Sequence, residues 1–207
     1  MSDFQTDQEK FWAGEFGDLY ANRNRGEEFL GSQINYFSKI FESMQPIKSV
    51  MEFGANIGEN LKAIQLLSPK AKLSAVEINI QAVKELKKWA KNSVKVYAQS
   101  ILDFKPDHKS DFVFTKGVLI HMNPEKLDKV YQLLYNTSSK YICIGEYYSP
   151  TPTQVTYRGN SDRLFKRDFA GEIMKKYKNL RLIDYGFSYH KDNNFPQDDI
   201  TWFLFEK

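Results

Sequence analysis

The sequence predicts an α/β fold, and three patterns in its 207 residues indicate it. Short apolar stretches alternate with amphipathic helical stretches after about residue 30, as expected for parallel strands joined by crossover helices. The chain closes on two apolar stretches separated by a polar loop alone, which indicates an antiparallel pair. Proline or glycine stands at several boundaries between these stretches. We therefore expect one mainly parallel sheet, covered by helices on both faces, that ends in a hairpin.

Strands are expected where β-branched and aromatic residues gather in short runs. The expected strands are 47–53, 72–77, 94–97, 111–115, 141–146, 180–189 and 200–206. Helices are expected where apolar residues recur at spacings of three and four. The expected helices are 29–44, 61–67, 80–91, 124–138 and 168–178. The segment 149–158, rich in Pro, Thr and Tyr, is expected to be a loop that is long enough to be functional.

The composition argues against several classes of protein. There are 29 Lys and Arg against 26 Asp and Glu, a net charge of +3 that is too small to indicate a nucleic-acid partner. No run reaches the about 18 apolar residues that span a bilayer, and the first residues are polar, so neither a membrane segment nor a secretion signal is expected. The one cysteine, Cys143, excludes a disulfide framework, and three scattered histidines predict no metal site. We expect a cytoplasmic protein with one main domain.

The segment from Val50 to Asn60 carries the most informative pattern. A strand ends on Glu52 and Phe53, the chain turns at Gly54, and a helix begins after Gly58. The two glycines permit a tight turn and a close approach of the backbone to a nucleotide-like ligand. Asn56 stands where a further glycine is common, and asparagine tolerates left-handed backbone geometry. The alternative is an ordinary turn between a strand and a helix.

Glu77 supports the ligand interpretation. It ends the second expected strand, 25 positions after Glu52, where a carboxylate can accept both hydroxyl groups of a ribose. The alternative is a solvated carboxylate at a strand end. Gln99, Ser100 and Ile101 follow the third strand and are expected to face an adenine edge, and residues 115–122 are expected to form the floor of the pocket near its reactive end.

These residues resemble the first motifs of class I S-adenosylmethionine-dependent methyltransferases over roughly residues 30–207. Glu52, Gly54 and Gly58 match the family's acid-x-Gly-x-Gly-x-Gly pattern, which the chain departs from at Asn56, and Glu77 matches the acid after the second strand. The family's third motif often carries an acid where this chain has Gln99 or Ser100. The resemblance implies S-adenosylmethionine as the cofactor. It also implies a Rossmann-like, doubly wound sheet of seven strands in the order 3-2-1-4-5-7-6, with strand seven antiparallel.

Carried onto this chain, the resemblance predicts a set of residues that contact the cofactor. They are Arg23, Glu52, Gly54, Ala55, Asn56, Gly58, Glu77, Ile78, Ser100, Ile101, Lys116 and Gly117.

The first 30 residues are expected to form a helical cap, and residues 31–207 the methyltransferase domain. Residues 8–24 are rich in aromatic residues and interrupted by glycine. Together with EFGANIGEN they are similar to methylases associated with the biosynthesis of pseudaminic acid and related nonulosonic acids. The resemblance implies a sugar-derived acceptor of the pseudaminic or legionaminic type in surface glycan biosynthesis. Tyr20, Arg23 and Asn24 are expected to close over the cofactor, with Arg23 on its methionyl carboxylate; the alternative is an ordinary amphipathic cap.

Methyl transfer from a sulfonium is an in-line displacement that depends mainly on alignment and on the exclusion of water. A base is needed only when the acceptor must lose a proton, and His121 is the candidate, with Tyr20 as a second candidate catalytic residue. The alternative role of His121 is to form a wall of the pocket. An acceptor pocket is expected after the fifth strand, and the alternative there is a surface loop. Its candidate residues are Glu146, Tyr147, Tyr148, Tyr157 and Arg158, with Arg163 beside them.

Three other functions remain open at this stage. A nucleic-acid methyltransferase is disfavoured because Thr115, Lys116, Gly117 and Val118 stand where an Asn/Asp-Pro-Pro-aromatic tetrapeptide would grip a flipped adenine. A nicotinamide oxidoreductase is disfavoured by the closing hairpin. A non-catalytic protein that binds the cofactor is the third alternative.

Overall fold

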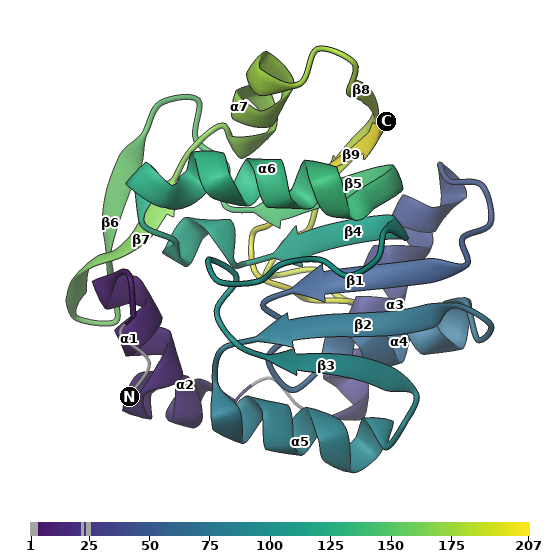
Figure 1. Cartoon of the computed structure of the whole chain (residues 1–207), viewed down its shortest axis with the longest axis horizontal. Coiled ribbons are helices and arrows are strands. Elements are labelled where there is room, and N and C mark those ends of the chain that lie inside the picture. The colour runs from purple at the N-terminus through teal and green to yellow at the C-terminus, as the bar shows by residue number, and fades with distance from the viewer. Residues whose placement is uncertain (1–3, 22, 24–25) are drawn as a thin grey trace.

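The computed structural model describes residues 4–21, 23 and 26–207. Seven strands form its central sheet. They are β1 Ser49–Phe53, β2 Lys72–Glu77, β3 Val94–Ala98, β4 Ser110–Lys116, β5 Ser138–Glu146, β8 Arg181–Phe187 and β9 Thr201–Glu206. Their order is β3-β2-β1-β4-β5-β9-β8 (Figure 1). The five strands from β1 to β5 run parallel, whereas β9 is antiparallel to both β5 and β8. The predicted α/β fold with a closing hairpin is confirmed.

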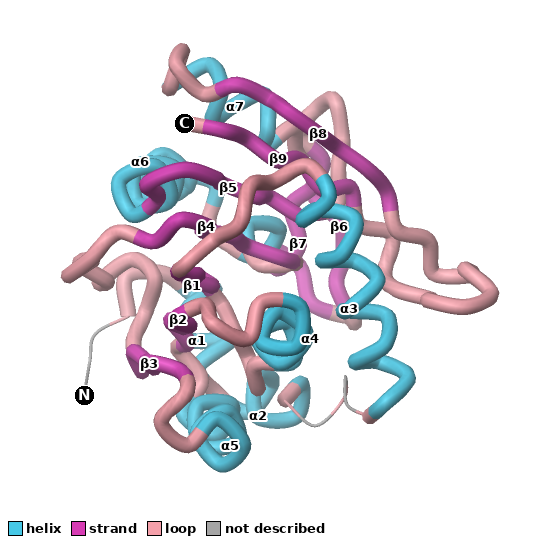
Figure 2. The backbone as a smooth tube through the Cα atoms, turned by 90° about the vertical axis from the view of Figure 1, so that its right-hand side faces the viewer, coloured by secondary structure: helices cyan, strands magenta, loops and turns pink. Residues whose placement is uncertain are grey.

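Helices cover both faces of this sheet, as Figure 2 shows. The main helices are α3 Glu27–Glu42, α4 Glu59–Leu67, α5 Ile80–Ala90, α6 Leu127–Thr137 and α7 Phe169–Lys176. Val50 of β1 packs in the core cluster with α3, α4 and α5, whereas its neighbour Met51 packs in the cluster with α6 and α7. Successive residues of a strand point to opposite faces, so a central parallel strand must be apolar at nearly every position. This is why the central strands appear in the sequence as continuous apolar runs.

The connection after β4 consists of two 3-10 turns and a helix, not of a single helix. The expected helix 124–138 begins with a 3-10 turn, Pro124–Lys126, and continues as α6. Asn123 caps the turn by accepting from the main-chain N–H of Glu125 at 2.9 Å. Proline at the first position needs no N–H partner, which explains why the turn starts there. A second 3-10 turn, Leu119–His121, precedes it.

The segment 149–158, which we expected to be a loop, is part of a hairpin. Strands β6 Thr153–Tyr157 and β7 Asn160–Lys166 pair antiparallel and form a separate small sheet. Arg158 and Gly159 make the turn, and both have positive φ, 49° and 80°. Two positive φ values define the turn type that matches the twist of a two-residue hairpin. The expectation was wrong because these strands are polar and Leu164 is their single buried residue, so they lack the apolar runs that indicate a buried strand.

The N-terminal helices α1 Asp7–Ala13 and α2 Glu15–Tyr20 lie beside the carboxyl ends of the parallel strands (Figure 1). Hydrogen bonds attach them to two distant segments. Gln8 donates to the main-chain oxygen of Asp162 in β7 at 3.0 Å, and Asn79 donates to Asp18 at 2.8 Å. The two helices therefore bridge the hairpin and the edge of the sheet. None of the helices in the described part of the chain combines the length and apolarity needed to cross a bilayer.

Candidate functional site

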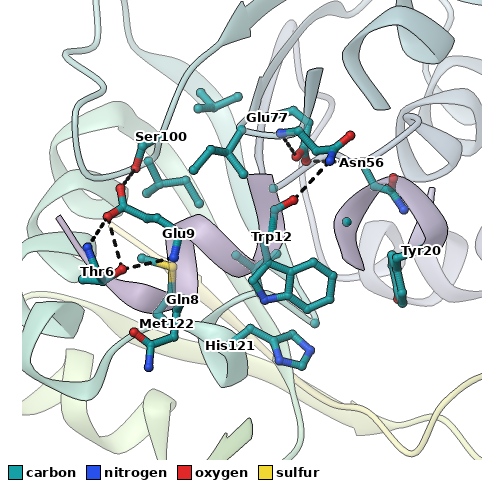
Figure 3. Close-up of a pocket in the computed structure, with 18 residues that line it drawn as sticks. Thr6, Gln8, Glu9, Trp12, Tyr20, Asn56, Glu77, Ser100, His121 and Met122 are labelled. Carbon is teal, nitrogen blue, oxygen red and sulfur yellow. Dashed lines mark hydrogen bonds between the residues drawn. The ribbon is translucent and has the colours of Figure 1, made fainter. Parts of the chain in front are cut away.

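A cavity lies where the carboxyl ends of β1, β2 and β4 meet the N-terminal helices (Figure 3). We call it the main cavity. It is lined by Thr6, Gln8, Glu9, Trp12, Gly17, Tyr20, Gly54, Asn56, Val76, Glu77, Ile78, Asn79, Ser100, Ile101, Gly117, Val118, His121 and Met122. A second depression, the side hollow, shares Tyr20, Gly54, Asn56 and Gly117 with it. The further residues of the side hollow are Phe29, Ala55, Ile57, Glu59, Asn60, Lys116, Asp198 and Ile200.

The loop after β1 has the backbone that the sequence predicted. Gly54, Asn56 and Gly58 have φ values of 76°, 48° and 83°. A Cβ atom on Gly54 would lie 2.5 Å from Cγ2 of Val118, so close packing as well as backbone conformation requires glycine there. Asn56 adopts the left-handed conformation, which confirms the reason given for its place in the motif. The loop therefore brings main-chain atoms to the cavity wall without side chains in the way.

Glu77 is buried at the cavity wall, only 7% exposed, and it holds the loop in place. Its two carboxylate oxygens accept from the main-chain N–H groups of Asn56 and Asn79, each at 2.7 Å. Burial raises the pKa of Glu77, and these main-chain hydrogen bonds counteract part of the rise. The alternative of a solvated carboxylate at a strand end is therefore wrong.

Glu52 and Lys116 are neighbouring titratable groups at the side hollow, and each affects the pKa of the other. Glu52 is fully buried and accepts from Asn60 Nδ2 at 2.6 Å, and burial raises its pKa to about 8. Lys116 lines the hollow and donates to Gln33 and, at 2.6 Å, to Gln197. Burial lowers the pKa of Lys116 to about 7, whereas attraction to Glu52 opposes that change. Glu52 itself does not line either depression.

His121 ends the first 3-10 turn after β4 and lines the main cavity. Its Nδ1 atom lies 2.6 Å from the main-chain oxygen of Arg163. A carbonyl oxygen only accepts, so Nδ1 carries the proton and Nε2 of the neutral ring keeps a free lone pair. Burial lowers the pKa of His121 to about 4, which keeps the ring neutral near pH 7. The ring centroids of Trp12 and Tyr157 lie 4.6 and 4.8 Å from that of His121.

The residues predicted to bind the acceptor occupy three different places. Glu146 is 2% exposed and lines neither depression; it accepts from the main-chain N–H groups of residues 118–120 at 3.0 to 3.3 Å. Burial raises the pKa of Tyr147, and Asp198 beside it adds to the rise. Tyr148 is 45% exposed and faces Phe203.

The hairpin places Tyr157 in the aromatic cluster around His121. Arg158 stacks on Tyr157 with its guanidinium carbon 5.8 Å from the ring centroid. The guanidinium of Arg163 stacks on Phe11 of the N-terminal helix at 5.1 Å. Tyr157 is thus the one predicted acceptor residue, of the five, whose ring packs against His121 among the described residues.

The N-terminal helices contribute residues to which the sequence analysis assigned no role in the site. Glu9 and Trp12 line the main cavity, as does Asn79 of the sheet edge, which donates to the main-chain oxygen of Trp12 at 3.2 Å. One signal was present: Thr6 and Glu9 have the spacing of a capping box, which predicts a helix start at Thr6. Of the three residues expected to close over the cofactor, Tyr20 lines both depressions, Arg23 stacks on Phe16 and Tyr20, and Asn24 lies outside the described residues.

Ala55, Ile78, Ile101 and Gly117 all lie in the walls of the two depressions, as does Ser100. Gly58 does not line either depression. It packs against α5, and a Cβ atom there would lie 2.8 Å from Trp89 and 3.0 Å from Leu86. No cluster of three or more His, Cys, Asp or Glu side chains suited to a metal ion occurs in the part of the chain that the structure describes.

No family model matches the chain, and no curated protein matches it by sequence. Solved structures do match its fold. An S-adenosylmethionine-dependent methyltransferase from Leishmania major matches with a TM-score of 0.70 at 15% identity, over 97% of this chain and 86% of that one. A 1,6-didemethyltoxoflavin N1-methyltransferase from Burkholderia thailandensis, with bound S-adenosylhomocysteine, matches with a TM-score of 0.69 at 12% identity over 97% and 86%.

Magnesium protoporphyrin IX methyltransferase from Synechocystis, with bound S-adenosylmethionine, matches over 100% of both chains with a TM-score of 0.66 at 13% identity. At such identities the likeness concerns the fold alone. The chain therefore has the α/β Rossmann-like fold of S-adenosylmethionine-dependent methyltransferases.

Proposed function

We propose that the protein is an S-adenosylmethionine-dependent methyltransferase that acts on a small molecule. One observation carries the proposal: the buried carboxylate of Glu77 holds the glycine-containing loop at the cavity wall through the N–H of Asn56. The carboxylate that we propose for the ribose diol and the backbone turn thus lie side by side at the carboxyl ends of the strands, where ligands bind in sheets of this kind. Solved proteins of the same fold carry S-adenosylmethionine or S-adenosylhomocysteine.

The cofactor is proposed to lie across both depressions. The oxygens of Glu77 accept from the main-chain N–H groups of Asn56 and Asn79, and after a third such bond from Ile78 the carboxylate keeps acceptor capacity for a ribose hydroxyl. The methionyl group would lie in the side hollow against Gly54 and Gly117, with its carboxylate near Lys116 or Arg23. The adenine would extend toward Ser100 and Ile101. The close contact between Gly54 and Val118 fits this placement, because any side chain at residue 54 would fill the space between the two depressions.

The bound cofactor supplies a methyl group on a sulfonium, which is already a good leaving group. The chain's part is to align the acceptor and exclude water. Trp12 and Tyr157 flank His121 and narrow the space in which an acceptor can lie. Nε2 of His121 would accept a hydrogen bond from the attacking group and so orient its lone pair. It would take that proton late, once the methylated atom is positive and acidic, because a ring with a lowered pKa is a weak base.

Glu146 is proposed to act on the acceptor site indirectly. It binds three consecutive main-chain N–H groups of the turn that carries His121. A buried carboxylate with three donors fixes that turn more firmly than water would. We therefore assign it as a positioning residue for His121.

The acceptor is proposed to be a sugar or nonulosonic acid derivative of the pseudaminic or legionaminic type. Trp12 lines the main cavity and the ring centroid of Tyr157 lies 6.4 Å from that of Trp12, and we propose these rings as apolar faces for a sugar ring. Arg158 and Arg163 stand beside this cluster, and no ion pair joins either of them to a carboxylate within the described residues. Two such guanidinium groups suit an acidic sugar. The aromatic pattern of residues 8–24 supports the same class of acceptor.

Calorimetric titration with S-adenosylmethionine, S-adenosylhomocysteine and NADH tests the cofactor. We expect heat with the two sulfur ligands and none with NADH. Transfer of labelled methyl to free and nucleotide-activated nonulosonic acids then tests the acceptor. The absence of binding to either sulfur ligand would overturn the function, whereas binding without transfer to any of these sugars would overturn the acceptor alone.

A further inference from the structure

We propose that Glu9, on helix α1, selects the purine base of the cofactor by accepting a hydrogen bond from the base's exocyclic amino group. This inference rests on the proposed function and adds to it a specificity residue that lies outside the sheet.

The position of Glu9 in the cavity points to the base. Glu77 marks the proposed ribose position, and in Figure 3 it lies between the Ser100–Glu9 pair on one side and Asn56 and Tyr20 on the other. The side hollow opens on the Asn56 and Tyr20 side. A ligand with its methionyl group in the hollow and its ribose at Glu77 therefore directs its base toward Ser100 and Glu9.

At this end of the cavity the side chains of Glu9 and Ser100 can only accept a hydrogen bond from a ligand. Oε2 of Glu9 accepts from the main-chain N–H of Thr6 at 2.8 Å and from its hydroxyl at 3.1 Å, and Oε1 accepts from the Ser100 hydroxyl. Two carboxylate oxygens offer about four lone-pair sites, so one site on Oε1 remains for a ligand. The Ser100 hydroxyl uses its one O–H to donate to Glu9, and its oxygen also accepts from the N–H of Leu102 at 3.0 Å. A base edge that donates fits here, and a carbonyl edge does not.

A second atom of the same helix also requires a donor. Gln8 lines the main cavity and is 8% exposed. Its Nε2 donates to Asp162, whereas its Oε1 is buried and has no hydrogen-bond partner among the described residues. Buried acceptors in folded proteins are normally satisfied. The first turn of α1 therefore carries a second buried acceptor without a partner, next to Glu9 at the cavity wall.

The test compares S-adenosylhomocysteine with S-inosyl-L-homocysteine, which carries a 6-oxo group in place of the 6-amino group. We expect the wild-type protein to bind the amino form at least about tenfold more tightly. In the oxo form, the 6-oxo oxygen and the Glu9 carboxylate are both acceptors and would lie opposite each other. Glu9→Gln is the informative variant. Glutamine at this position still serves a capping box, so α1 keeps its start, but the side chain now presents an amide N–H donor toward the base.

In Glu9→Gln we expect affinity for S-adenosylhomocysteine to fall about tenfold and affinity for the 6-oxo analogue to stay or rise. Glu15→Gln is the matched control, since it removes the same charge from an exposed residue of the N-terminal helices and should change neither affinity. Equal binding of the two ligands by the wild type, or an equal loss of both in Glu9→Gln, would overturn the role of Glu9 and leave the proposed function standing. A wild-type protein that binds neither ligand would overturn both.

Discussion

The Nδ1 atom of His121 lies 2.6 Å from the main-chain oxygen of Arg163, so the turn after β4 is tied to strand β7 of the small hairpin. This bond determines which nitrogen of the ring is free. It also explains why Tyr157, in the partner strand β6, packs against the same ring. The hairpin therefore sets both the tautomer and the surroundings of the candidate base.

His121→Asn should separate catalysis from cofactor binding. The asparagine amide can replace the Nδ1 donor to Arg163, but nothing replaces Nε2. We expect the rate constant for methyl transfer to fall about a hundredfold, a common size for the loss of a general base, with the Kd for S-adenosylhomocysteine unchanged. Steady-state kinetics and calorimetry measure the two quantities. His190→Asn, at an exposed histidine that pairs with Asp199, is the control, and an unaltered rate in His121→Asn would exclude the role of Nε2.

His121 should also make the protein sensitive to acid. Burial lowers its pKa from 6.5 to about 4, so between these values the unfolded chain binds a proton that the folded protein does not. The free energy of unfolding therefore falls as the pH falls through this window. From pH 7 to pH 5 the wild type should lose about 2 kcal/mol more than His121→Asn loses. Urea denaturation of both proteins at the two pH values measures the difference, and parallel losses would contradict the shift.

Glu146→Gln should loosen the turn that carries His121. The amide keeps one acceptor oxygen for the three N–H groups of residues 118–120 and directs its own N–H toward them. We expect the free energy of unfolding to fall by about 1 to 3 kcal/mol, the usual cost of unsatisfied buried donors. We also expect a rate about tenfold lower, with the affinity for S-adenosylhomocysteine within about twofold of the wild type. Glu125→Gln, an exposed residue of the next turn, is the control. A loss of cofactor affinity equal to the loss of rate would argue against a positioning role.

Glu77→Gln should weaken cofactor binding. It removes one of the two oxygens that hold Asn56 and Asn79 and are proposed to accept the ribose hydroxyls. We expect affinity for S-adenosylhomocysteine to fall at least about tenfold. A 2′-deoxyribose analogue should bind more weakly than S-adenosylhomocysteine to the wild type but about equally to the variant. Glu42→Gln, on the exposed end of α3, is the control. Full affinity in a folded Glu77→Gln protein would refute the assignment of the ribose site.

Lys116 should make cofactor affinity depend on pH. Burial lowers its pKa to about 7, so the free protein loses this positive charge as the pH rises through neutrality. If the methionyl carboxylate lies near it, affinity for S-adenosylhomocysteine should fall between pH 6 and pH 9, by up to about tenfold for each pH unit above that pKa. In Lys116→Met this decline should disappear. Glu52 titrates in the same range and interacts with Lys116, so the same two curves are also measured in a Glu52→Gln background, where the difference between them belongs to Lys116 alone. Lys140→Met, an exposed lysine that pairs with Asp111, should behave as the wild type.

Local patterns in the sequence were sufficient to predict the main architecture and the loop at its centre. The central strands are buried on both faces and so appear as apolar runs, and Gly54, Asn56 and Gly58 need left-handed φ values that few other residues adopt. Glu77 could be placed because the end of a second parallel strand lies beside the end of the first. Each of these features depends on neighbours in the chain or on adjacent strands.

The tertiary structure alone determined which residues complete the site. Glu9 meets Ser100 across 91 positions, and His121 meets Arg163 across 42, where separate elements pack together. No local pattern encodes such contacts, because they depend on how the N-terminal helices and the β6–β7 hairpin lie over the end of the sheet. Glu146 illustrates the same limit: its place at a strand end predicted an acceptor residue, but burial directs its carboxylate to the turn that carries His121. Sequence periodicity determines which elements form, whereas the packing of those elements determines which polar groups are left facing the cavity.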